Sequence, residues 1–165
     1  MNGTADQTKM LTDAAGTETF LSGQISLCGS FSHNLDAKGR INFPAKLREI
    51  IGEKFMVARG IGKKFLAVYS MEMWMNVQQQ LMAQPGQAGE ALMRWVNAGA
   101  AEVTPDKQGR ILIPGPLREY AQLRKDVLVV GAGRKAEIWN PVLFKEEDDA
   151  FNPADYPELL DQLRL

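Results

Sequence analysis

Hydrophobic and polar positions alternate in two neighbouring stretches of this 165-residue chain. Residues 31–35 alternate weakly, and Arg40–Phe43 alternates regularly, with polar residues at 40 and 42. A period of two is typical of a strand that is buried on one face. The intervening Asp36-Ala-Lys-Gly39 is a turn sequence, because Gly readily takes a positive φ and Asp accepts hydrogen bonds from the backbone ahead of it. We therefore predict two strands joined by a tight turn.

A short helix and a hairpin are expected next. Pro44 suits the first turn of a helix over residues 45–51, and Gly52 suits its end. Two further strands, at 55–58 and 65–69, flank Gly60-Ile-Gly62. A Gly-x-Gly segment between two strands favours a hairpin turn over a phosphate-binding loop, which needs a strand followed by a helix.

The whole pattern then returns, so the chain contains a tandem duplication. The second copy predicts strands at 101–104, 110–113, 127–130 and 136–139, a helix at 116–122 and a second hairpin turn at 131–133. Eight positions are identical between residues 36–49 and 106–119: Asp36/Asp106, Gly39/Gly109, Arg40/Arg110, Ile41/Ile111, Pro44/Pro114, Leu47/Leu117, Arg48/Arg118 and Glu49/Glu119. Because charged and turn residues repeat along with apolar ones, the duplication points to a chemical surface that is presented twice.

Two linking helices and an acidic end complete the pattern. We predict helices at 71–83 and 87–98, broken at Pro85-Gly86, a short helix from Pro141 through Lys145, and a terminal amphipathic turn at 158–165. The resulting division has four parts: a flexible N-terminal arm (1–28), a first repeat with the linking helices (29–100), a second repeat (101–145) and an acidic C-terminal tail (146–165). Met and Trp residues of the linking helices serve either as packing residues or as an adaptable partner surface.

The formal net charge of −1 hides an uneven distribution. Residues 36–64 contain eight Lys/Arg and three acids, and residues 106–135 contain seven Lys/Arg and three acids. Residues 145–165 contain seven acids and two basic residues. Two basic repeats within an acidic chain favour a polyanion as the partner of the repeats, although ordinary solvated faces also fit these numbers.

Composition argues against several classes of protein. No apolar run is long enough for a transmembrane helix, and the start of the chain lacks the features of a secretory signal. Cys28 is the only cysteine, which excludes an internal disulfide and fits a reducing cytoplasm. His33 is the only histidine, and no paired carboxylates lie at a turn, so we expect no enzyme activity, no metal site, no cofactor and no small-molecule substrate.

The strongest chemical signal is the motif Asp-x-x-x-Arg, which occurs at Asp36–Arg40 and at Asp106–Arg110. A carboxylate and a guanidinium across a turn form a charge-assisted bond that fixes the shape of the loop. A fixed loop that projects cations also suits phosphate contact, and Arg reads guanine bidentately in the major groove. Both roles remain open for each arginine.

These motifs resemble the MraZ family of bacterial transcriptional regulators, which is associated with the division and cell-wall gene cluster and belongs to the AbrB-like swapped-hairpin superfamily. The resemblance rests on the two Asp-x-x-x-Arg motifs, the Gly-Arg-Ile-x-x-Pro continuation, the run Leu117–Tyr120 and the segment Glu137–Trp139, and it spans about residues 29–144. It implies an α+β fold in which two AbrB-like repeats interlock as a double-psi swapped-hairpin β-barrel with peripheral helices. It also implies a ring-shaped homo-oligomer.

The resemblance further implies a cytoplasmic, nucleoid-associated protein that binds double-stranded DNA. The expected role is a sequence-specific regulator, most simply a repressor, of repeated promoter boxes that include those of its own promoter. The expected DNA contacts are Arg40 and Arg110, then Lys38 and Lys107, with Asp36, Gly39, Asp106 and Gly109 orienting the loops and Arg48 and Arg118 as secondary basic candidates. A protein-assembly or antitoxin-like protein, which would use the same barrel to hold a protein partner, is the alternative.

Overall fold

The computed structural model describes residues 10–12, 18–20 and 26–165. The first copy contains β3 (Ser30–Asn34), β4 (Arg40–Asn42), α1 (Ala45–Ile51), β5 (Phe55–Arg59) and β6 (Leu66–Ser70). The second copy contains β7 (Ala101–Val103), β8 (Arg110–Leu112), α4 (Gly115–Tyr120), β9 (Asp126–Gly131) and β10 (Ala136–Trp139). The linking helices are α2 (Met71–Met82) and α3 (Gly86–Ala98), and the chain ends with α5 (Pro141–Ala150), η1 (Pro153–Asp155) and α6 (Pro157–Asp161).

Most of the predicted N-terminal arm lies outside the described residues. Within it, β1 (Met10–Thr12) and β2 (Glu18–Phe20) pair as antiparallel strands. Leu27 bridges to Gly133 and is buried, which ties the end of this segment to the β9–β10 hairpin. Cys28 beside it is an exposed free thiol.

Every strand and helix predicted between residues 30 and 140 is present. The Gly-x-Gly segments are hairpin turns, because β5 pairs with β6 and β9 pairs with β10 as antiparallel neighbours. One prediction was too short: the helix that begins at Pro141 runs to Ala150 and not to Lys145. Its extension is supported by an ion pair from Lys145 to Asp149, one helical turn later, at 2.5 Å.

Strands of the two copies are interleaved in one six-stranded antiparallel sheet of order β3-β9-β10-β6-β5-β7. At one edge β3 of the first copy pairs with β9 of the second, and at the other edge β7 of the second copy pairs with β5 of the first. In the centre β10 pairs with β6. Exchanging the two copies gives the same order read from the other edge, so the sheet has an internal pseudo-twofold axis between β10 and β6.

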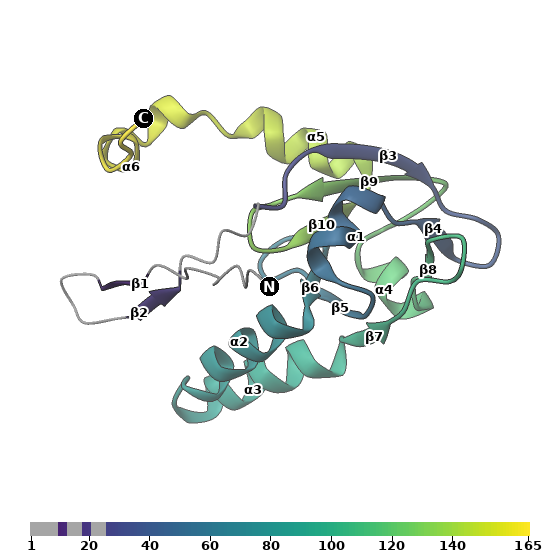
Figure 1. The fold of residues 1–165 in the computed structure, drawn as a ribbon, viewed down its shortest axis with the longest axis horizontal. Coiled ribbons are helices and arrows are strands. Elements are labelled where there is room, and N and C mark those ends of the chain that lie inside the picture. The colour runs from purple at the N-terminus through teal and green to yellow at the C-terminus, as the bar shows by residue number, and fades with distance from the viewer. Residues whose placement is uncertain (1–9, 13–17, 21–25) are drawn as a thin grey trace, which may run out of the picture.

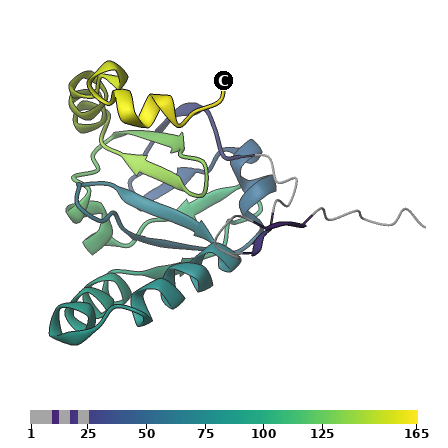
Figure 2. The same ribbon diagram turned by 90° about the vertical axis from the view of Figure 1, so that its left-hand side faces the viewer.

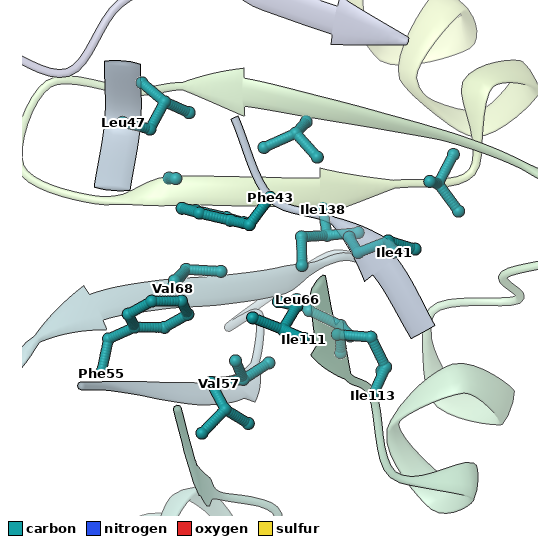
Figure 3. Packing of buried hydrophobic residues seen from close by; sticks show 14 of the residues in the cluster. Ile41, Phe43, Leu47, Phe55, Val57, Leu66, Val68, Ile111, Ile113 and Ile138 are labelled. Atoms are coloured by element: carbon teal, nitrogen blue, oxygen red, sulfur yellow. The ribbon is translucent and has the colours of Figure 1, made fainter. Parts of the chain in front are cut away.

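The remaining strand of each copy forms a separate two-stranded ribbon, β4–β8. Its inner face carries Ile41 and Ile111, which lie directly opposite each other and are 1% and 0% exposed. Figure 3 shows both side chains among those of the sheet, and Phe55 and Leu66 belong to the same buried cluster. Burial of these apolar side chains holds the ribbon against the sheet.

Apart from the β1–β2 pair, the described strands form an open sheet and the separate ribbon, and the closed barrel that the resemblance implies is not found among them. The broader prediction of an α+β fold with peripheral helices is confirmed. The ribbon and α6 lie at opposite ends of the molecule in Figure 1. The acidic end of the chain therefore does not cover the ribbon of the same chain.

The linking helices α2 and α3 lie antiparallel beside the end of the sheet that contains β5, whereas α5 lies near its other end, beside β9 (Figures 1 and 2). Trp74 and Leu81 of α2 and Val96 of α3 form a second buried cluster with Ala58 of β5. This cluster shows that part of the Trp and Leu content of the linking helices is used for packing. Met75 and Met82 of α2 remain exposed.

Candidate nucleic-acid interface

The first Asp-x-x-x-Arg motif is a closed turn held by one carboxylate. Oδ1 of Asp36 accepts hydrogen bonds from the backbone N–H groups of Lys38 and Arg40, both at 2.9 Å. Oδ2 accepts from Nε of Arg40 at 2.8 Å. The backbone N–H of Gly39 donates to the carbonyl of Asp36 at 3.0 Å, and Gly39 has a φ of 83°. These bonds, together with the positive φ of Gly39, hold the turn in one conformation.

The second motif repeats this geometry. Oδ1 of Asp106 accepts from the backbone N–H groups of Gln108 and Arg110, at 2.9 and 3.0 Å, and Oδ2 accepts from Nε of Arg110 at 2.8 Å. Gly109 takes a φ of 79°. The cations beside the arginines differ, because Gln108 occupies the place of Lys38 and Lys107 stands one position earlier. Both lysines are exposed.

The hydrogen bonds lower the pKa of both loop carboxyl groups. The backbone N–H of Arg40 is the main cause that lowers the pKa of Asp36. Desolvation opposes it, and the Arg40 side chain and the backbone N–H of Lys38 lower the pKa further. The pKa of Asp106 is lowered in the same way, chiefly by the backbone N–H of Arg110. Each loop thus holds its shape at neutral pH.

The two loops lie at opposite ends of the β4–β8 ribbon and are bonded across it. The backbone N–H of Phe43 donates to the carbonyl of Gly109 at 3.0 Å, and that of Ile113 donates to the carbonyl of Gly39 at 2.9 Å. Each strand therefore starts at the loop of its own copy and ends at the loop of the other copy. The two motifs belong to one surface.

The outer face of the ribbon follows from the same alternation that buries its inner face. It carries the side chains of Arg40, Asn42, Arg110 and Leu112, with Arg40 opposite Leu112 and Asn42 opposite Arg110. The arginine side chains are 27% and 29% exposed, and Leu112 is 55% exposed. Asn42 and Leu112 were absent from the predicted site, although their positions in the alternating pattern already placed them beside the arginines.

The secondary basic candidates lie elsewhere than their sequence positions suggest. Arg118 packs against Gly39 of the first loop, and Arg48 packs against Gly109 of the second loop. Each arginine thus contacts the loop of the other copy. Local sequence gives no signal for this exchange, because it depends on the pairing of β4 with β8.

Between residues 26 and 165, no three His, Cys, Asp or Glu side chains come together as metal ligands do. Within the same range, no helix combines the length and the apolar character needed to cross a bilayer.

Comparison with known proteins gives one consistent match. The family model described as "MraZ protein, putative antitoxin-like" matches residues 27–94 and 96–155. A protein named transcriptional regulator MraZ from Thermoanaerobacter sp. (strain X514) is 44% identical over 122 residues, which cover 73% of this chain and 85% of that protein. Proteins of the same name from Carboxydothermus hydrogenoformans and Acetivibrio thermocellus are 41% and 46% identical, over 82% and 68% of this chain and 94% and 79% of their own lengths.

Proposed function

The chain belongs to the MraZ family, and from this membership and the paired cationic loops we propose that it is a DNA-binding transcriptional regulator. The observation that carries the proposal is the β4–β8 ribbon, which presents Arg40 and Arg110 on one outward face. A two-stranded ribbon fits the major groove of B-DNA. The relatives' shared name supports a role in transcription.

Holding the loop and reading a base use different atoms of the same arginine. Arg40 donates its Nε to Asp36, and Arg110 donates its Nε to Asp106. Among the described residues, the two terminal nitrogens of each guanidinium, Nη1 and Nη2, make no hydrogen bond, so they suit bidentate donation to O6 and N7 of guanine. The shaping role and the contact role of each arginine are therefore compatible.

The register of the ribbon sets the spacing of these contacts. Asn42 lies opposite Arg110, so Arg40 and Arg110 are two residues apart along the ribbon. Two residues of antiparallel strand span about 7 Å. That distance equals about two base-pair steps. Leu112, opposite Arg40, is placed to meet a thymine methyl group.

The exposed lysines of the two loops, Lys38 and Lys107, supply phosphate contacts in this proposal. We also propose that the interleaved repeats are AbrB-like swapped hairpins whose ribbon completes a double-psi barrel. Further parts of the proposal are a ring-shaped homo-oligomer, repression at repeated promoter boxes including those of the chain's own gene, and a cytoplasmic, nucleoid-associated location. Several loops on one oligomer would gain affinity through effective concentration.

A gel-shift series on DNA upstream of the chain's own gene tests the proposal. Arg40→Ala and Arg110→Ala should each weaken binding by about 5-fold to about 150-fold, because a bidentate base contact contributes about 1 to 3 kcal/mol. Arg134→Ala is the control for loss of one positive charge, since Arg134 is an exposed arginine that lies outside both loops, in the β9–β10 hairpin. Equal binding by all three variants and by the unchanged protein would refute the site.

A protein-binding role is the second candidate, and the C-terminal end favours it. Phe151, Tyr156 and Leu159 are 54%, 50% and 52% exposed within the acidic tail. Exposed apolar side chains beside charged ones are typical of a surface that meets another protein. Recovery of a stoichiometric protein partner, together with no preference for promoter DNA over scrambled DNA, would favour an antitoxin-like or assembly role.

A further inference from the structure

The guanidinium groups of Arg118 and Arg48 each pack against the turn of the other copy. A methyl group built on Gly39 would lie 2.6 Å from Nη1 and 2.7 Å from Cζ of Arg118. A methyl group built on Gly109 would overlap Nη1 of Arg48 and lie 3.1 Å from its Cζ. Only glycine leaves room for a guanidinium at these two places.

The path of the backbone explains the exchange. β4 leaves the loop of Gly39 and runs along the ribbon until the backbone N–H of Phe43 donates to the carbonyl of Gly109. Helix α1 begins two residues later, so its Arg48 lies beside the Gly109 loop. The chain that leaves Gly109 through β8 and α4 brings Arg118 to the Gly39 loop by the same route.

Neither guanidinium is neutralised by an acid that the structure describes. Among residues 26–165, the ion pairs of the two loops join Asp36 to Arg40 and Asp106 to Arg110 and involve neither Arg48 nor Arg118. Nε of Arg118 is buried without a hydrogen-bond partner among these residues. A partly exposed guanidinium that is held in place by packing, and whose N–H groups donate to no described residue, is suited to bind an oxyanion.

We propose that each DNA-binding loop is completed by the arginine of the other repeat, which donates to a backbone phosphate of the duplex. Arg118 is then the third cation of the Gly39 loop, beside Lys38 and Arg40. Arg48 is the third cation of the Gly109 loop. The inference rests on the proposed DNA binding of the loops and adds to it a contact that crosses between the copies.

Salt dependence of binding tests the phosphate contact. The probe is a fluorescent duplex of the DNA upstream of the chain's own gene, and the variants are Arg118→Met and Arg118→Lys in the full chain. Loss of one phosphate contact lowers the slope of log K against log salt by about 0.9 for each loop engaged. Arg118→Met should show this loss, and Arg118→Lys, which keeps the charge, should retain the slope of the unchanged protein.

Double variants test the crossing itself. Arg118→Met should couple with Arg40→Met, giving a combined loss of affinity smaller than the product of the single losses, because both residues serve one loop. With Arg110→Met, which alters the other loop, the losses should multiply. Circular dichroism and light scattering confirm that each variant keeps its fold and its oligomeric state.

The outcomes separate this inference from the proposed function. If the unchanged protein binds promoter DNA with a steep salt slope but Arg118→Met has the same slope, the inference is wrong and the proposed function stands. Coupling of Arg118 with Arg110 in place of Arg40 also overturns the inference. If the unchanged protein shows no salt-dependent binding of the duplex, the proposed function fails, and the inference fails with it.

Discussion

Substitution of Gly39 by Ala, compared with a control glycine, separates the backbone strain of the turn from the packing of Arg118 against it. Gly39 and Gly62 have nearly the same φ, 83° and 86°, in a conformation that side chains other than glycine rarely adopt. They differ in their surroundings, because a methyl group at Gly62 meets nothing within 4 Å, whereas one at Gly39 meets the guanidinium of Arg118. Gly62→Ala is therefore a matched control for the backbone cost.

The free energy of unfolding should fall by similar amounts in the two variants. An L-residue in the left-handed region costs about 1 to 2 kcal/mol. The added collision in Gly39→Ala involves the far end of a long side chain, which moves away at little further cost. DNA affinity should then fall about tenfold in Gly39→Ala alone, since a hydrogen bond to a charged group contributes about 1.5 kcal/mol.

Urea unfolding, followed by tryptophan fluorescence at one fixed protein concentration, gives the free energies, and fluorescence anisotropy with promoter DNA gives the affinities. Two results would refute the reasoning. Equal DNA affinity in the two variants would show that the position of Arg118 against Gly39 does not affect DNA binding. A loss of more than about 4 kcal/mol in Gly39→Ala, beyond twice the backbone cost, would show that the guanidinium cannot move aside.

Three further predictions concern the ribbon core, the loop carboxylates and the tail. Ile111→Ala should lower the free energy of unfolding by about 2 to 5 kcal/mol in urea titrations, because Ile111 is fully buried, and the exposed Leu112→Ala should change it by less than about 0.5 kcal/mol. The pKa values of Asp36 and Asp106 are lowered in the folded protein, so these carboxylates stabilise the fold above the unfolded pKa of about 4, and this stabilisation is lost as pH falls through the folded pKa values. In an acid titration, the free energy of unfolding of Asp36→Asn should therefore depend less on pH than that of the unchanged protein. Removal of residues 151–165, which are all exposed, should leave the melting temperature unchanged, and a clear decrease would show that the tail packs on another subunit.

Local chemistry was sufficient to predict the turns and the elements beside them. The φ of Gly39 and the bonds accepted by Asp36 follow from residues that are at most four positions apart. The same holds for α1, whose observed bounds, Ala45–Ile51, match the predicted ones. Such features depend on intrinsic conformational preferences and short-range hydrogen bonds, so they can be predicted from a single sequence.

The arrangement of the two copies could not be predicted in this way. The alternation of residues 40–43 shows that β4 has one buried face, but it does not show that the neighbouring strand is β8. Strand pairing between distant segments is decided by the packing of the whole core, which is a property of the fold and not of the local pattern. The contacts of Arg48 and Arg118 with the loop of the other copy depend on that pairing, so the sequence did not predict them.

The duplication preserves charged residues because each copy completes the other. Arg118 can pack against the first turn in this way only if residue 39 has no side chain, and the same requirement holds for Arg48 and residue 109. A change at Gly39 therefore acts on Arg118, more than seventy positions later in the sequence, and a change at Gly109 acts on Arg48, more than sixty positions earlier. The identity of Gly39 with Gly109 and of Arg48 with Arg118 is then a single requirement of one shared surface. On this view neither loop is an independent module, and a chain that contained only one repeat could present a complete loop only by pairing its ribbon strand with that of a second copy.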